Sequence, residues 1–513
     1  MTVPQNSNRI IEFAEQIKFV RCIRYCFSSV KRIIFLWRNA FFCGRIRKNF
    51  RGHARKETNG MKRQIDFTQG NIVRAIVLFS IPLIMGELLQ NLYNSADAFV
   101  VGNLVDQNAL AAVTVCGVIS NMIVSFFNGM SVGSNVVAAK ACGRGDWAQI
   151  CRTVRVAYSF GVVLGVALSL LGVLLAPQLL HLAGTQADYF ADALVYLRIY
   201  LAGLMFTVIY NNAAGILRAL GRSDIPFRIL LVSCVLNIAL DLLFVGTFRM
   251  GIAGVGFATV LAQGVSVALV ARAVGRLVQG CCFDPREMAR EGGDVIAEVL
   301  RTGMSAGLQS ALISLSNIFI VRYMNLFSTE SVAGIGIAER LNRFVILPAK
   351  SFGITMTTYV AQNLGAGHRE RLRAGLIRCM LVALGVTLSL TAVISLFTEQ
   401  CVALFSPEPE VIAVGAATMR VMAPMFWVMA MREVMVGVLR GCGRNLVPML
   451  LNLVGMIGVR QLYLAVMMGR GPAIEYIYYC YPIAWFATLL FIAFYYFAVR
   501  KSLLTPETDK ADG

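Results

Sequence analysis

The sequence predicts an all-α polytopic membrane protein with twelve transmembrane helices in two six-helix lobes. Hydrophobic residues make up 57% of the 513 residues and charged residues only 15%, well below the roughly 25% typical of soluble proteins. Apolar runs long enough to cross a hydrocarbon core recur along the chain. The two halves also carry similar segments in the same order, which predicts lobes related by pseudo-twofold symmetry along the membrane normal.

Twelve apolar runs of membrane-spanning length follow residue 70. Their approximate limits are 71–101, 110–139, 153–181, 190–217, 226–247, 252–275, 298–325, 332–362, 374–398, 411–439, 446–468 and 474–499. The connecting loops alternate in charge: one set holds basic residues such as Lys140, Arg222 and Arg369, and the other holds acidic residues such as Asp106 and Glu330. Because basic loops stay in the cytoplasm, we predict a multi-pass protein of the cytoplasmic (inner) membrane with both termini cytoplasmic.

An internal repeat divides the chain. LRALGRSDIP at 217–226 matches LRGCGRNLVP at 439–448, and with a two-residue indel Asp97 superposes on Asn317. The repeat predicts that both halves of the chain insert into the membrane in the same sense, with a cavity between them. The predicted segments are a basic N-terminal extension (1–60), an N-terminal six-helix lobe (61–275), a cytoplasmic linker (276–297), a C-terminal six-helix lobe (298–500) and a cytoplasmic tail (501–513).

Residues 1–60 differ from the rest, with 13 Lys/Arg against 3 Asp/Glu, more than half of the net charge of +19. The apolar run Ile33–Cys43 is too short to span and lacks a signal-peptide cleavage site. Met61 offers a second start, so we interpret the segment as a dispensable extension or as sequence upstream of the true start, with a basic membrane-surface helix as the alternative. The remaining positive charge lies in short loops between apolar runs, which argues against nucleic-acid binding.

The distribution of reactive residues argues against an enzyme. The 13 cysteines show no metal-ligand spacing, and the three histidines (His53, His181 and His368) are far apart. No cluster of nucleophiles or acid–base pairs marks a membrane face. We therefore expect no cofactor. We also expect a monomer whose partners are small organic molecules and the lipid bilayer.

The run Ser80–Gly102 (SIPLIMGELLQNLYNSADAFVVG) is an apolar helix that carries Asp97. A carboxylate at membrane depth is costly and marks a functional site by default. Pro82 removes an internal hydrogen bond and predicts a bend in the same helix. The helix thus combines an ionisable group with a point of flexure.

Further polar groups lie at similar predicted depth. Asn237 and Asp241 are one turn apart on one helix face, and Thr259 lies two turns into the sixth run. Asp97, Asp241 and Thr259 are roughly 7, 9 and 11 Å from the outer ends of their spans at about 1.5 Å per residue. Two carboxylates with amide and hydroxyl oxygens suit Na⁺, and they suit a proton equally well. The coupling ion stays open.

A family resemblance rests on the motif IPLIMGELLQNLYNSADAFVVG, on NIALD in the fifth span, on GIAGVGFAT in the sixth and on the twin LRxxGR segments. With these motifs, the chain resembles the multidrug and toxic compound extrusion (MATE) transporters over roughly residues 66–500. The resemblance implies a two-lobed cation-coupled exporter whose first helix bends at its proline. It places the cation site, a metal site if the ion is Na⁺, on Asp97, Asn237, Asp241 and Thr259. The implied supporting network consists of Tyr93, Tyr196 and Asn211.

The C-terminal lobe departs from the family pattern. Some branches carry an acid in the seventh helix and another in the tenth, but here the seventh span has Asn317 and the tenth has only Glu433. Glu433 is a candidate C-lobe polar site, and the alternative is an ion pair with Arg432 or Arg460. The departure leaves a second cation site doubtful.

The predicted function is an antiporter that exports organic compounds, cationic or amphiphilic, in exchange for Na⁺ or H⁺ by alternating access. The alternative is a flippase for a lipid-linked saccharide, which would need a basic central cavity. Arginines within spans, such as Arg340, Arg343 and Arg460, are consistent with that alternative. The exported compound, the coupling ion and its stoichiometry are not fixed by the residues.

Overall fold

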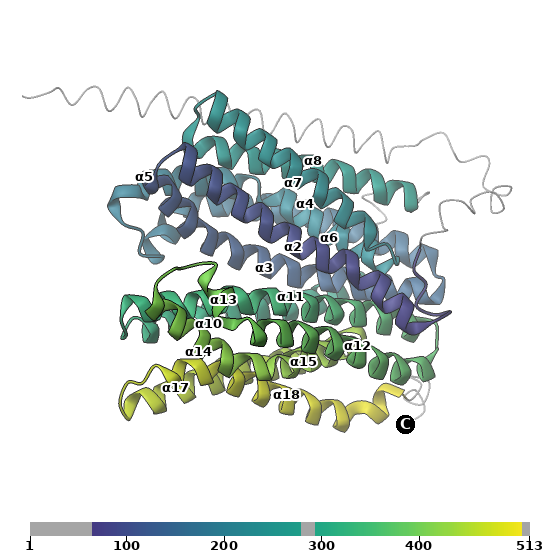
Figure 1. Cartoon of the computed structure of the whole chain (residues 1–513). Helices are drawn as coiled ribbons and strands as arrows, with labels where there is room; N and C mark the ends of the chain where they lie inside the picture. Colours follow the sequence, from purple (N-terminus) through teal and green to yellow (C-terminus); the bar gives the residue numbers. More distant parts are fainter. Residues whose placement is uncertain (1–63, 279–292, 505–513) are drawn as a thin grey trace, which may run out of the picture.

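The computed structural model describes residues 64–278 and 293–504, and every element assigned within these ranges is a helix. The helices run side by side and form two groups, α2–α8 and α10–α18 (Figure 1). Each group comes from one half of the sequence, which confirms the predicted fold class. The predicted extension 1–60 and parts of the predicted linker and tail (279–292 and 505–513) lie outside the described residues.

The N-terminal lobe contains the helices of the first six predicted spans. Their bounds are α2 Ile72–Leu104, α3 Gln107–Arg144, α4 Trp147–Leu182, α5 Ala187–Ala202, α6 Leu204–Ala219, α7 Asp224–Asp241, the π-helical turn η2 Leu242–Thr247, and α8 Gly251–Leu277. Side-chain caps fix where the first two begin: Asn71 accepts from the Arg74 N–H and Asp106 from the Ala109 N–H. Such caps satisfy backbone donors that a helix start leaves unpaired.

The C-terminal lobe repeats this order of helices. Its bounds are α10 Gly293–Met324, α11 Thr329–Gly365, α12 Arg369–Leu396, the short α13 Thr398–Ala403, α14 Pro409–Met422, the 3-10 turn η3 Ala423–Met425, α15 Phe426–Gly441, α16 Leu446–Leu453, the π-helical turn η4 Val454–Val459, α17 Arg460–Gly469, and α18 Glu475–Leu504. The π turns η2 and η4 lie in corresponding spans of the two lobes. The repeat seen in the sequence therefore extends to an irregularity of the backbone.

The twelve predicted spans are all represented. Eleven helices within the described ranges are long and apolar enough to cross a membrane, and α5 and α6, which meet at a 44° bend, meet the same criteria when taken together as a twelfth span. The sequence predicts a single span at 190–217, and the structure divides it at Gly203. A Cβ on Gly203 would lie 2.5 Å from Cγ2 of Val260. Glycine thus allows α8 to pack against the bend.

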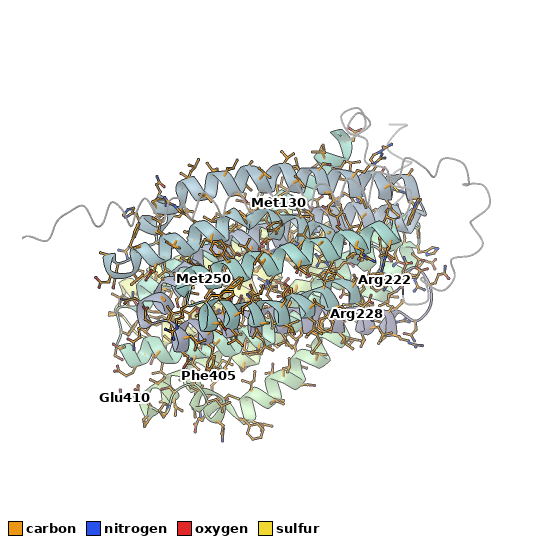
Figure 2. All side chains as sticks on the ribbon, turned by 90° about the horizontal axis from the view of Figure 1, so that it is seen from above. Met130, Arg222, Arg228, Met250, Phe405 and Glu410 are labelled. Atoms are coloured by element: carbon orange, nitrogen blue, oxygen red, sulfur yellow. The ribbon has the colours of Figure 1, made fainter. Side chains whose placement is uncertain are left out.

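The charged loops define the two ends of the bundle. Arg222 and Arg228 lie at one end, here called the basic end, and Met250, Phe405 and Glu410 lie at the other, here called the outer end (Figure 2). The starts of α2 and α12 and the ends of α3, α6 and α11 lie at the basic end. The positive-inside pattern assigns this end to the cytoplasm, and that orientation stays a prediction.

Glycines bring α3 and α10 into backbone contact between the lobes. The sequence GMSVG at 129–133 faces GMSAG at 303–307. A Cβ on Gly133 would lie 2.2 Å from the Val299 carbonyl oxygen, and a Cβ on Gly303 would lie 2.5 Å from the Met130 carbonyl oxygen. Small residues spaced by four allow membrane helices to approach this closely.

Hydrogen bonds join the lobes in the half of the bundle nearer the basic end. The Ser80 hydroxyl of α2 lies 2.8 Å from the Thr355 hydroxyl of α11. Asn135 of α3 and Thr358 of α11 bond at 3.2 Å, and the Gln362 amide donates to the Ala219 carbonyl at 2.7 Å. The lobes are thus closed against each other toward the basic end.

Candidate cation site

Two acidic side chains meet inside the N-terminal lobe. Asp97 of α2 is 5% exposed and Asp241 of α7 is fully buried, and their carboxyl groups lie within hydrogen-bonding reach of each other. The sequence placed these groups at equal depth in one lobe, and the structure brings them into direct contact. Two carboxylates this close repel unless a cation or a proton lies between them.

Asn237 connects the two acids. Its carboxamide can present its nitrogen to them, which then donates to Asp97 Oδ1 at 2.9 Å and to Asp241 Oδ2 at 3.2 Å. With the amide turned the other way, three oxygens converge, and that arrangement needs a cation at its centre. The residue set therefore fits both an ion-free form held by the amide nitrogen and a form that holds a small cation through oxygen.

The local sequence explains why this site forms on α7. Asn237 and Asp241 are four residues apart and share a helix face, and Asp241 is the last residue of α7 before the π turn η2. A π turn widens the helix by one residue and frequently occurs at functional sites. Here it begins directly after the carboxylate.

No basic side chain neutralises the pair. Within residues 64–278 and 293–504, neither Asp97 nor Asp241 forms an ion pair with a lysine, arginine or histidine. Buried charges in proteins are ordinarily paired, and membrane spans tolerate them only with a partner. The missing positive charge is the main electrostatic feature of this site.

Two hydroxyl groups with unused bonding capacity lie beside the acids. Thr259 of α8 is 1% exposed, and its hydroxyl has no hydrogen-bond partner among the described residues. The Tyr93 hydroxyl of α2 is equally buried and unpartnered, and it approaches Thr259 and Asp97. Unsatisfied buried oxygens are costly unless a ligand completes them. Both predicted residues therefore join the site.

Aromatic residues of α5 line the same region. Tyr196 lies near Asp97, as predicted, and stacks on Tyr200 with ring centroids 6.4 Å apart. Tyr200 also lies near Asp97, and its neighbours include Gln263 of α8, which accepts from Thr207 at 2.9 Å. The sequence reasoning missed Tyr200 and Gln263. The spacing of Tyr200 one turn after Tyr196 was the available signal.

Asn211 is the predicted network member that the structure does not connect to the acids. It lies half-buried on α6, and no hydrogen bond links it to another residue in the described part of the chain. Its neighbour Asn212 is the bonded one, since it accepts from the Ser134 hydroxyl at 3.1 Å and donates to the Val208 carbonyl at 3.2 Å. A network function of Asn211 stays a prediction.

α2 connects this site to the other lobe. It runs as one helix through Pro82, with Ile76 and Phe79 packed among C-lobe residues such as Met356 and with Asp97 held by α7. The predicted flexure point thus lies between the two attachments. The same helix carries Glu87, which the sequence reasoning overlooked and which lies near Arg218 of α6.

Glu433, the candidate C-lobe polar residue, is engaged by an arginine. Its carboxylate bonds to Arg432, the next residue on α15, and the two side chains are 17% and 7% exposed. The ion pair was the alternative interpretation of Glu433. Arg432 Nε and Nη1 are buried without a partner among the described residues.

The repeat counterpart of Asp97 contacts an arginine instead of an acid. Asn317 Oδ1 accepts from Arg460 Nη2 at 3.1 Å, and Ser316 Oγ accepts from the same nitrogen at 2.8 Å. Arg460 is 2% exposed, follows the π turn η4 directly, and lies 5.9 Å from the Tyr481 ring centroid. The acid pair of the N-terminal lobe has no basic partner among the described residues, whereas the corresponding part of the C-terminal lobe contains Arg460.

Comparison with known proteins identifies one family and several relatives described as multidrug resistance proteins. A family profile described as MatE matches residues 82–243 and 306–466, one segment in each lobe. "Probable multidrug resistance protein YpnP" of Bacillus subtilis is 29% identical over 391 residues, covering 76% of this chain and 87% of that protein. "Probable multidrug resistance protein YoeA" of the same organism is 26% identical over 450 residues, covering 85% and 96%.

A solved structure shares the fold. It is described as the outward-facing conformation of a multidrug resistance MATE family transporter of the MOP superfamily. It superposes with a TM-score of 0.78 at 21% identity, covering 86% of this chain and 99% of that one. At this identity the likeness concerns the fold alone.

Proposed function

This chain belongs to the MatE family of transporters, and from that premise we propose that it exports amphiphilic organic compounds in exchange for Na⁺ or H⁺. Its relatives named above are described as multidrug resistance proteins. The observation that carries the exchange is the contact between Asp97 and Asp241, which have no basic partner among the residues that the structure describes. None of the findings above supports a lipid-linked saccharide flippase over this function.

The coupling ion would bind at the Asp97–Asp241 pair and supply its positive charge. Na⁺ would take oxygens from Asp97, Asp241, Asn237 and Thr259, a hard-ligand set that suits it. A proton would instead bridge the two carboxyl groups while the Asn237 nitrogen donates to them. Both forms neutralise the pair, so both explain why a buried acid pair is kept in a membrane lobe.

α2 offers a route from ion binding to lobe movement. Ion occupancy fixes the Asp97 end of α2 against α7, while the Ser80 end remains bonded to α11. Pro82 lacks the N–H that would bond to the Leu78 carbonyl, so the helix flexes there at low energy. Ion and substrate each shift the population of the two bends of α2 only by their differential affinity for them.

We place the protein in the cytoplasmic membrane as a monomer with both termini cytoplasmic.

Counterflow in proteoliposomes tests the exchange. The wild-type protein is compared with Asp97→Asn and Asp241→Asn under imposed Na⁺ or pH gradients, with a fluorescent organic dye such as ethidium or fluorescein as cargo. We expect either substitution to abolish gradient-driven transport while the protein still inserts, because each removes half of the ion's counter-charge. The gradient that drives the wild type identifies the ion. Normal gradient-driven transport by Asp97→Asn would remove the acid pair from the mechanism.

A further inference from the structure

Three exposed cations lie along one side of α11. Arg340, Arg343 and Lys350 are all exposed, although most of α11 is buried. The central twenty residues of this 37-residue helix run from 338 to 357, and about twenty residues span the hydrocarbon core. All three cations are therefore at membrane depth. We call them the α11 cation stripe.

The stripe lies on the side of α11 that α3 covers nearer the basic end. Steps of three or four residues continue it along α11 to Thr358 and Gly365. Thr358 bonds to Asn135 of α3, and a Cβ on Gly365 would lie 2.1 Å from the Lys140 carbonyl oxygen of α3. One face of α11 is thus covered by α3 near the basic end. Closer to the outer end, the same face carries the exposed cations. Charged side chains at membrane depth point in this way toward protein or water.

α3 presents neutral polar side chains at the same level. Thr114, Asn121 and Asn128 are exposed and precede Asn135 at intervals of seven residues, which keeps them on nearly one helix face. Counting outward from the Asn135–Thr358 bond, Asn128 is level with Lys350 and Asn121 with Arg343. At this level, α3 therefore offers hydrogen-bonding groups and α11 offers positive charge.

The α11 cation stripe has little counter-charge. Within residues 64–278 and 293–504, Arg340, Arg343 and Lys350 form no ion pair and no hydrogen bond. The acid near Lys350 is Glu433, which is bonded to Arg432 and also lies near Arg440.

Other acids of the region are also engaged. Glu339 of α11 accepts a hydrogen bond from Tyr481, and Glu87 of α2 lies near Arg218. Asp97 and Asp241 are buried within the N-terminal lobe, on α2 and α7. Among the described residues, the α11 cation stripe therefore has no acid paired with it.

We propose that the α11 cation stripe binds the acidic group of an amphiphilic organic anion, and that such anions are the compounds this protein exports. The inference rests on the proposed exporter function and narrows its substrate class. Arginine pairs with carboxylate, sulfonate or phosphate through two parallel hydrogen bonds. Phe344, adjacent to Arg343 and 49% exposed, offers contact for the apolar body. Of the cationic or amphiphilic cargo that the sequence predicts, the structure favours amphiphilic acids over organic cations.

The test compares cargo of opposite charge in one proteoliposome assay. Fluorescein serves as the amphiphilic anion and ethidium as the cation, and a short-chain fluorescent phosphatidylglycerol serves as a lipid with an anionic headgroup. The test variant is Arg343→Gln/Lys350→Gln. The charge-keeping variant is Arg343→Lys/Lys350→Arg. The matched control is Arg322→Gln, an exposed arginine on the same side of α10 as the exposed Leu308 and Leu315.

We expect the wild type to carry fluorescein in preference to ethidium. The double glutamine variant should lose about tenfold or more of fluorescein transport, which corresponds to one lost charge-assisted pair. The charge-keeping variant should restore most of it, and Arg322→Gln should match the wild type. The same pattern with the labelled lipid, and not with fluorescein, would assign the stripe to a lipid headgroup and overturn the soluble-anion export.

Failure of the inference is separable from failure of the proposed function. Ethidium transport that depends on Asp97 and is unchanged by the double glutamine variant would keep the exporter and overturn the anion site. Absence of gradient-driven transport of all three cargoes would overturn both. A detergent size-exclusion profile identical to wild type, together with the charge-keeping variant, separates lost binding from misfolding.

Discussion

The two lobes share one fold but neutralise their buried acids differently. In the N-terminal lobe, Asp97 and Asp241 lie within hydrogen-bonding reach of each other, and neither forms an ion pair with a basic residue in the described part of the chain. In the C-terminal lobe, Arg460 binds Asn317, which corresponds to Asp97 in the repeat, and Arg432 binds Glu433. A repeated backbone therefore does not imply a repeated site. The C-terminal lobe neutralises its buried acid with an arginine of its own, and in the N-terminal lobe the proposed coupling cation would do so.

Neutralising one acid in each lobe should have opposite effects on stability. Glu433→Gln leaves Arg432 buried without an anion, and breaking such a pair costs about 3–5 kcal/mol of unfolding free energy. Asp97→Asn removes repulsion between two buried acids and should leave stability unchanged or raised. Thermal unfolding of both variants in detergent, in buffer without added Na⁺, measures the contrast.

A paired substitution controls the Glu433 experiment. Replacing both members, as in Arg432→Met/Glu433→Leu, removes the uncompensated charge and should recover most of the lost stability. A Glu433→Gln variant as stable as the wild type would show that the ion pair is not needed by the C-terminal lobe. The distinction between an internally neutralised lobe and one awaiting a cation would then fail.

The contact that joins the lobes depends on the small size of glycine. A Cβ on Gly133 of α3 would lie 2.2 Å from the Val299 carbonyl oxygen of α10, whereas a Cβ on Gly117 of the same helix has nothing within 4 Å. Gly133→Val should therefore destabilise the protein by about 1–3 kcal/mol and reduce transport. Gly117→Val is the matched control and should leave unfolding unchanged. Equal effects at both positions would indicate that helix propensity, not contact between the lobes, is decisive.

Much of the fold was predictable because membrane spans are encoded locally. Run lengths gave all twelve spans, and the repeat gave the two lobes. The break at Gly203 was not predicted, because it depends on the approach of Val260 from another helix. Glycine at 203 does not by itself distinguish a bend from a close contact.

The site was predictable where residue type and depth were sufficient. Asp97, Asn237 and Asp241 come together because two helices place them at one depth, and a carboxylate in a span is rarely incidental. The α11 cation stripe, by contrast, could not be found from depth alone. Whether Arg343 faces lipid, its own lobe or α3 follows from the Asn135–Thr358 contact, which only packing shows.

The smallest expected effect concerns a single hydrogen bond between the lobes. Thr355 Oγ1 donates to the Ser351 carbonyl at 2.8 Å, so its one hydrogen is used and Ser80 must be the donor between α2 and α11. Interhelical hydrogen bonds in membrane proteins are worth about 0.6 kcal/mol in double-mutant cycles. Ser80→Ala and Thr355→Val should each have a small effect, with a coupling of about this size.

The double-mutant cycle decides whether this bond links the two lobes. Ser389→Ala, which removes a hydroxyl bonded to Gly385 within its own helix, is the control and should show no coupling to Thr355→Val. In the proposed alternating access the Ser80–Thr355 bond would break when the lobes open near the basic end. Its loss should therefore shift the population toward the open arrangement by about threefold. Cross-linking rates of paired cysteines placed at Asn135 and Thr358 would report that shift. Zero coupling together with unchanged rates would mean that the glycine contact of α3 and α10 holds the lobes together without help from α2.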